Sequence, residues 1–217
     1  MTQTTFYLMR HGECEQGDLL RGHVDVPLSE LGFARMQLAY AKMPESVEVV
    51  VSSPLLRCQV FAEHLDRKRL NQQEALTISC DDRLKEIYFG DWDGLGIDEL
   101  YSQHEASLTS YWDNPWQNPL PGAETMQAFE SRVDQLLEQL VEQHAGKKIL
   151  LITHGGVIRH LMAKALGVQG QVGFYTQLSL NYASVVKISH YFDKQASRQG
   201  SQSIQSHWRL YWGESAS

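Results

Sequence analysis

Short apolar segments alternate along this chain with longer segments whose apolar residues recur at helical spacing. The strand-like segments are residues 6–9, 47–51, 76–79, 148–153, 185–191 and 208–212. Strands that alternate with helices pair mostly in parallel, and the helices then cover both faces of the sheet. The order of segments therefore predicts an α/β fold, a three-layer sandwich with a mostly parallel central sheet and helices on both faces.

The helical segments carry recognisable start and stop signals. Helices are predicted over residues 30–42, 53–65, 126–141 and 155–166. Ser29 is a suitable N-cap for the first helix, and Pro54 fits the first turn of the second, where its missing N–H costs nothing. Gly167 follows the last periodic residue of the fourth helix and is expected to end it.

Two segments interrupt this alternation. Residues 97–123 combine Trp112 and Trp116 with three prolines, and we expect an inserted helical or irregular lid there. Residues 193–206 are polar and are expected to form a loop. A chain of 217 residues with 42% hydrophobic residues can bury one substantial core. We therefore predict a single domain over residues 1–217 that carries the lid and the loop.

Composition and charge narrow the range of partners. The formal net charge is −7 and no run of lysine or arginine is present, which argues against a nucleic-acid-binding surface. No apolar stretch approaches the ~20 residues needed to cross a bilayer, and the first residues do not resemble a signal peptide. Three cysteines without a CxxC pair favour a reducing, cytoplasmic compartment. We expect a small anionic ligand held by a few local arginines, and the oligomeric state is left open.

The side chains that follow three of the predicted strands share one chemistry. Arg10 and His11 come directly after the first strand, Arg57 follows the second, and His154 follows the strand at 148–153. Ligands collect at the carboxyl ends of strands in an open α/β sheet. Two arginines can grip phosphoryl oxygens, and two histidines can provide a nucleophile and a cationic donor. These residues predict a phosphoryl-transfer site.

Glu86 is a further candidate for this site. It lies in the largely apolar segment Leu84-Lys85-Glu86-Ile87-Tyr88-Phe89-Gly90. A carboxyl group in apolar surroundings can act as a proton donor near neutral pH. A solvated loop carboxylate is the alternative, and the residues alone leave both interpretations open.

The ordered set of these motifs resembles the histidine phosphatase superfamily, also called phosphoglycerate-mutase-like. The set comprises Arg10-His11-Gly12-Glu13, Gly22 with Asp25-Val26-Pro27-Leu28, Ser53-Pro54 through Arg57, Glu86 with Phe89-Gly90, and Thr153-His154-Gly155-Gly156. The resemblance runs from about residue 6 to residue 191. It implies hydrolysis of a phosphomonoester without a metal or another cofactor, because arginines supply the positive charge.

The resemblance also assigns roles to the five candidates. It implies that His11 becomes phosphorylated and that Arg10, Arg57 and His154 bind the phosphate. Glu86 is implied to be the proton donor. The site residues expected to be catalytic are therefore these five, and no metal ligand is expected.

The chain departs from the family pattern close to the first motif. Cys14 stands where the family usually has threonine or serine, and Gly17 stands where mutases carry an asparagine. Arg21 is a candidate to replace the lost phosphate contact, and Gly22, beside it, is a second candidate for substrate binding. These departures favour hydrolysis of a monophosphate over mutase chemistry.

Further strings resemble one branch of the family, the α-ribazole-5′-phosphate phosphatases. They are Glu86 through Gly94, Pro121-Gly122-Ala123-Glu124-Thr125, and His154 through Arg159. This likeness implies dephosphorylation of α-ribazole 5′-phosphate in assembly of the cobalamin nucleotide loop. A broad-specificity phosphatase, or a sugar-phosphate or phosphoglycerate phosphatase of the same superfamily, is the alternative. A non-catalytic module that binds a phosphorylated ligand is a weaker one, because His11 and Glu86 are both present.

Overall fold

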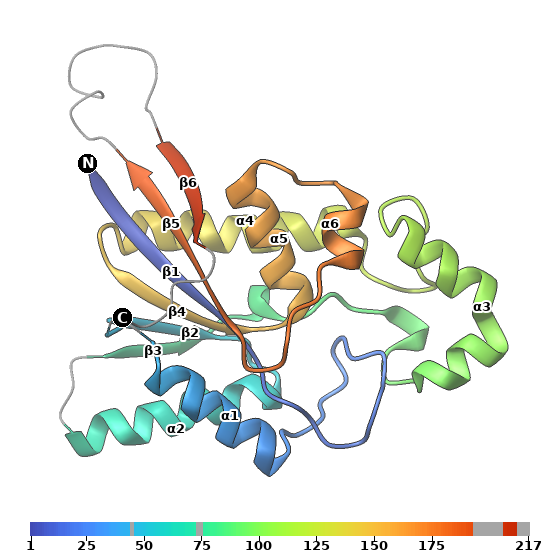
Figure 1. Ribbon diagram of the computed structural model, residues 1–217, viewed down its shortest axis with the longest axis horizontal. Coiled ribbons are helices and arrows are strands. Elements are labelled where there is room, and N and C mark those ends of the chain that lie inside the picture. Colours follow the sequence, from blue (N-terminus) through green and yellow to red (C-terminus); the bar gives the residue numbers. More distant parts are fainter. Residues whose placement is uncertain (44–45, 73–75, 193–205, 212–217) are drawn as a thin grey trace.

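Six strands form one sheet at the centre of the structure, a computed structural model that describes residues 1–43, 46–72, 76–192 and 206–211 (Figure 1). The strands are β1 (Thr2–Arg10), β2 (Val49–Ser52), β3 (Thr77–Cys80), β4 (Lys148–Thr153), β5 (Val185–Phe192) and β6 (Ser206–Tyr211). Their order across the sheet is β3-β2-β4-β1-β5-β6. The first four in this order are parallel, whereas β5 is antiparallel to β1 and β6 is antiparallel to β5. The predicted mostly parallel sheet is confirmed.

Helices cover both faces of this sheet. They are α1 (Glu30–Ala41), α2 (Leu56–Gln72), α3 (Ile97–Asp113), α4 (Met126–Gln143), α5 (Gly155–Leu166) and α6 (Val172–Gln177), with short 3-10 helices at Asp82–Leu84 and Gly90–Trp92. In Figure 1, α1 and α2 lie on one face, and α4 and α5 lie on the other. The three-layer arrangement is therefore confirmed.

The central strands are apolar on both sides because each face meets a helical layer. Along β1, Phe6 and Leu8 pack into the core with α4 and α5, whereas Tyr7 and Met9 pack into the core with α1 and α2. Successive side chains of a strand point to opposite faces. A continuous apolar run is thus what a central parallel strand requires.

Several element boundaries agree with their sequence signals. The Ser29 side chain accepts a hydrogen bond from the backbone N–H of Gly32 at 3.0 Å and caps α1. Gly167 ends α5 in the left-handed conformation, at φ +68°. The strand β1 begins earlier than expected, at Thr2, because its polar first residues pair with β5.

The start of α2 corrects the sequence prediction. Pro54 lies ahead of the helix rather than in its first turn, and the helix begins at Leu56. The backbone N–H of Leu56 donates to the Asp25 carboxylate at 2.7 Å. A residue 31 positions earlier thus supplies the cap, and no local pattern could show this.

The segment predicted as a lid is mostly helical. The 17 residues of α3 bury Leu100, Leu108 and Tyr111, and the helix is kinked at His104, where the backbone leaves helical geometry. Its closest helical neighbour in the fold is α6, a helix too short for its periodicity to have predicted it. A lid function for 97–123 and the single-domain organisation stay predictions.

Part of the predicted C-terminal structure lies outside the described residues. The loop predicted at 193–206 is described only at Ser206, where β6 begins, and the strand predicted over 208–212 is described as far as Tyr211. None of the helices in the described part of the chain has the length and apolar character to cross a bilayer.

The contact between the end of β1 and the start of α1 can be tested by one substitution. A Cβ at Gly32 would overlap the backbone of Glu13, and a Cβ at Gly12 would overlap the backbone of Gly32. Glycine to alanine in a helix ordinarily stabilises by about 1 kcal/mol. Because backbone atoms cannot move aside, we expect Gly32→Ala to destabilise the fold by about 1–3 kcal/mol in urea denaturation.

The matched control is Gly173→Ala in α6. Its Cβ would meet only ordinary contacts, beginning 3.7 Å from the side chain of Gln177. This variant is expected to be neutral or slightly stabilising. A Gly32→Ala variant as stable as the control would show that the two backbones do not meet.

Candidate active site

Three strand ends meet at one edge of the sheet. β4 lies between β1 and β2, with Arg10 opposite Thr153 and Ser52 opposite Ile152. The backbone N–H of His11 donates to the Thr153 carbonyl at 2.9 Å, which fixes the first histidine beside the last residue of β4. The residues that sequence analysis placed at separate strand ends are therefore brought together.

His11 is held as a neutral imidazole with one nitrogen available. Only 5% of the residue is exposed. Its Nδ1 donates to the carbonyl of Gly12 at 2.7 Å, which fixes the tautomer, and no hydrogen bond among the described residues engages Nε2. Burial, followed by the positive charge of Arg57, lowers the pKa of His11 well below its ordinary value. The Nε2 lone pair thus has the properties of a nucleophile.

Arg57 is a completely buried cation. Its Nε donates to His154 Nδ1 at 3.2 Å, Nη1 to the Val24 carbonyl at 2.9 Å and Nη2 to the Gly22 carbonyl at 2.6 Å. A guanidinium has five N–H donors, so these three bonds orient it while leaving donors for phosphoryl oxygens.

His154 corrects one expectation about charge. We expected it to be a cationic donor, but the imidazole is fully buried, and burial followed by the charge of Arg57 lowers its pKa well below the ordinary value. Since Nδ1 accepts from Arg57, the proton lies on Nε2, which donates to Ser53 Oγ at 2.8 Å. His154 is therefore neutral in this structure and fixes the orientation of Arg57.

The contacts of Arg10 identify a residue near His11 that sequence analysis missed. The guanidinium carbon of Arg10 lies 4.1 Å from the centre of the Tyr182 ring. Nη1 of the same guanidinium donates to the Leu180 carbonyl. The same ring lies 5.6 Å from the imidazole of His11. Arg10 Nε is buried without a partner among the described residues, so it can bind an anion. Tyr182 has no signal in the sequence because it lies in an irregular segment before β5.

Arg21 and Gly22 occupy different places. Arg21 is anchored by the Gly17 and Glu15 carbonyls and by a 3.5 Å bond to the Tyr182 hydroxyl. It is thereby held near Arg10. Gly22 contributes its carbonyl to Arg57, and a Cβ there would overlap the carbonyl of Ile87. Their predicted roles in substrate binding stay predictions.

Cys14 packs against the Nδ1 side of the His11 ring. Its sulfur is 3.6 Å from His11 Nδ1 and 3.7 Å from the Gly12 carbonyl oxygen. Burial raises the pKa of this thiol, so it stays protonated near neutral pH. The cysteine therefore packs against the hydrogen bond that sets the tautomer of His11, away from Nε2.

Glu86 is buried and its carboxylate is oriented by backbone donors. Oε2 accepts from the Gly156 N–H at 2.9 Å and Oε1 from the Ile87 N–H at 3.1 Å. A Cβ at Gly156 would overlap this carboxylate, so only glycine admits it here. The interpretation of Glu86 as a solvated loop acid is wrong. The Tyr175 hydroxyl borders the same point, and burial raises its pKa well above the ordinary value.

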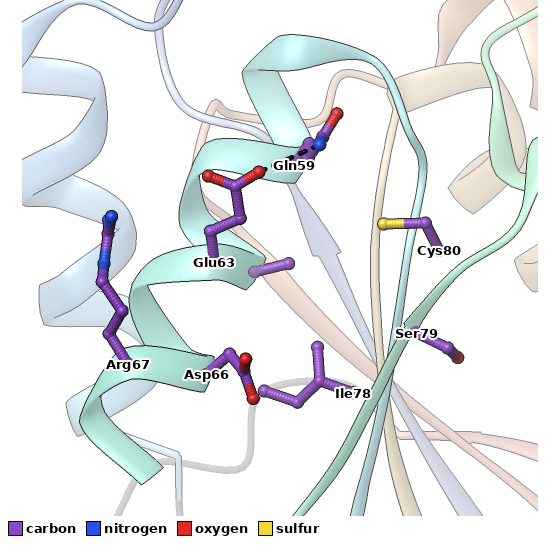
Figure 2. Close-up of a pocket in the computed structure, with 8 residues that line it drawn as sticks. Gln59, Glu63, Asp66, Arg67, Ile78, Ser79 and Cys80 are labelled. Atoms are coloured by element: carbon purple, nitrogen blue, oxygen red, sulfur yellow. Dashed lines mark hydrogen bonds between the residues drawn. The ribbon is translucent and has the colours of Figure 1, made fainter. Parts of the chain in front are cut away.

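A separate pocket of about 430 Å³ lies between α2 and β3 (Figure 2). The charged side chains that line it are Glu63, Asp66 and Arg67, and carboxylates outnumber cations among them. None of its lining residues is a predicted site residue. No cluster of three or more potential metal ligands occurs in the described ranges of the chain.

A neutral histidine with a free Nε2, two converging arginines and a buried carboxylate define a phosphoryl-transfer site on an α/β fold. The chain matches the model of the histidine phosphatase superfamily (branch 1) over residues 6–200. It belongs to this superfamily and is a phosphoric monoester hydrolase.

Individual relatives point to several phosphate esters. The adenosylcobalamin/α-ribazole phosphatase of Escherichia coli K12 is 30% identical over 190 residues, which cover 86% of this chain and 91% of the relative. Phosphoserine phosphatase 1 of Hydrogenobacter thermophilus is 26% identical over 164 residues, which cover 74% of this chain and 75% of the relative. The solved structure of a mycobacterial glucosyl-3-phosphoglycerate phosphatase superposes with a TM-score of 0.77 at 25% identity. The superposition covers 99% of this chain and 100% of that chain.

The opposite tautomers of the two site histidines give a test. At pH 6.5, ¹⁵N NMR of ring-labelled protein should show His11 as the Nδ1–H form and His154 as the Nε2–H form. Both pKa values are lowered, so each ring gains its second proton only at a pH below 6.5.

An internal reference is His160 on α5. Burial opposes protonation there, but the hydrogen bonds that the ring donates to the carboxylates of Asp134 and Glu130 raise the pKa of His160, so its ring is expected to be cationic at pH 6.5. His11→Asn and His154→Asn variants assign the signals. An imidazolium at either site position at this pH would contradict the described geometry.

Proposed function

We propose that this enzyme hydrolyses phosphomonoesters through a phosphohistidine on His11. The Nε2 lone pair of His11 attacks phosphorus while the bond to the leaving oxygen breaks, and Glu86 gives that oxygen a proton. Water then attacks phosphorus, its proton passes to Glu86, and the electron pair of the N–P bond returns to Nε2. The observation that carries this proposal is the Nδ1 hydrogen bond to Gly12, which leaves Nε2 unprotonated.

The remaining site residues hold the transferred group. Arg10 and Arg57 bind the equatorial phosphoryl oxygens, and His154 holds Arg57 in place and lines the site. The imidazole rings of His11 and His154 are 5.2 Å apart between centroids, so both border the phosphoryl position. Positive charge fixed beside the nucleophile stabilises the charge of the transition state without reorganisation.

The substrate that we propose is α-ribazole 5′-phosphate, in assembly of the cobalamin nucleotide loop in the cytoplasm. The similarity to the Escherichia coli relative supports it. A second support is an aromatic pair beside the acid: His23 and Tyr88 lie 5.1 Å apart, His23 Nε2 bonds the Glu86 carbonyl at 2.9 Å, and 39% of Tyr88 is exposed. Such a surface can stack on the aromatic base of the leaving group.

Trapping the intermediate tests the mechanism. With ³²P-labelled substrate and EDTA, the wild-type protein should form an acid-labile, base-stable phosphoenzyme, and His11→Ala should form none. Arg57→Ala should lower turnover at least ~100-fold, because a positioned donor to the transition state contributes ~3–4 kcal/mol. Lys68→Gln on the same helix, away from the site, is the charge-matched control. Labelling that survives in His11→Ala would refute the nucleophile.

A substrate series tests the leaving group. We expect the highest kcat/KM for α-ribazole 5′-phosphate among this ester, phosphoserine, 3-phosphoglycerate and glycerol phosphate. Tyr88→Leu should lower kcat/KM about tenfold for the α-ribazole ester, since stacking of a base contributes about 1–3 kcal/mol, and should leave glycerol phosphate unchanged. A preference for phosphoserine or phosphoglycerate would replace the proposed substrate but keep the mechanism.

A further inference from the structure

Arg132, on α4, donates its guanidinium N–H groups to the segment that carries Glu86 and to the Glu124 carboxylate. Nη1 donates to the carbonyls of Arg83 at 2.7 Å and Lys85 at 2.8 Å, and Nη2 donates to the carbonyl of Glu86 at 2.9 Å. Nε and Nη2 donate to the two oxygens of Glu124 at 2.7 and 2.8 Å. These five bonds equal the five N–H donors of a guanidinium.

The hydrogen bonds from Arg132 matter because residues 83–86 belong to no strand or α-helix, and only one 3-10 turn orders part of them. The carbonyl between those bound by Arg132, that of Leu84, accepts from Thr153 Oγ1 at 2.8 Å, which ties the segment to the end of β4. The carbonyl of Glu86 also accepts from His23. The backbone beneath the acid is therefore fixed from the helix on one side and from the sheet on the other.

Arg132 and Glu124 form an ion pair in which each charge stabilises the other. The side chains are only 19% and 17% exposed, and a bidentate pair in such surroundings is oriented as well as neutralised. Removing one member leaves the other charge poorly solvated. Lysine cannot replace the arginine, because an ammonium group is a point donor without the planar fork.

We propose that Arg132 and Glu124 are positioning residues that set the efficiency of leaving-group protonation by Glu86. The inference rests on the proposed function, in which Glu86 is the acid. The pair acts through the backbone of 83–86 and through the N–H of Tyr88, which donates to Glu124 at 3.4 Å. The Glu86 carboxylate then meets the Gly156 N–H and the leaving oxygen at the required place. A displacement of about 1 Å in such a group costs about 100-fold in rate.

Leaving groups of different basicity separate this role from a purely structural one. The leaving oxygen of an alkyl phosphate such as glycerol phosphate needs a proton, whereas 2,4-dinitrophenyl phosphate releases a weakly basic phenolate that needs none. For each we measure kcat/KM, which reports the steps up to departure of the leaving group. Glu86→Gln is the reference, Arg132→Lys and Glu124→Gln are the tests, and Lys164→Gln is the control because it breaks an α4 ion pair, that with Asp134.

Arg132→Lys and Glu124→Gln are expected to lower kcat/KM for glycerol phosphate about tenfold to 100-fold and to change that for the dinitrophenyl ester less than about threefold. Lys164→Gln should leave both values unchanged. Equal losses on both esters in the two test variants would overturn the proposal while Glu86→Gln still discriminates. If Glu86→Gln itself lowers both equally, Glu86 is not the acid and the mechanism fails first. Urea denaturation of each variant confirms that folded protein is compared.

Discussion

The geometry of the site depends on the complete burial of the Arg57 guanidinium. Burial of a guanidinium destabilises a fold unless hydrogen-bond acceptors surround the charged group. Its acceptors come from the 22–24 segment and from His154, so that segment, the start of α2 and the end of β4 must meet at one point. Burial is the largest cause of the lowered pKa values of His11 and His154, and the charge of Arg57 is the second. In the proposed mechanism, Arg57 thus both binds the phosphoryl group and keeps His11 unprotonated.

Much of the fold could be predicted because its signals are local. Ser29 and Gly167 mark helix ends by their own chemistry, and apolar runs mark strands that are covered on both faces. The start of α2 could not be predicted, since Asp25 caps it across a fold-level contact. Within 97–123 the sequence indicated a helical or irregular insertion but not the bounds of α3, which ends at Asp113, ahead of the three prolines.

The chemistry of the site was predictable to the level of residue types at strand ends. His11 and Arg57 follow strands, and parallel strands end at one edge, so their meeting follows from topology. The charge state of His154 was not predictable, because it depends on an arginine 97 positions away and on complete burial. Arg132 was also missed. Its role is carried by bonds to backbone carbonyls, which leave no trace in residue types.

The glycines of the two histidine motifs show how packing and chemistry share one constraint. Gly12 admits the backbone of Gly32, and Gly156 admits the carboxylate of Glu86. The first contact holds the segment after His11 against α1, and the second brings the Glu86 carboxylate to the start of α5, where it accepts from the N–H of Gly156. A side chain at either position would separate groups that act on the same phosphoryl group in the proposed mechanism. The spacing of these motifs therefore reflects how closely the backbone must approach, as much as which side chains react.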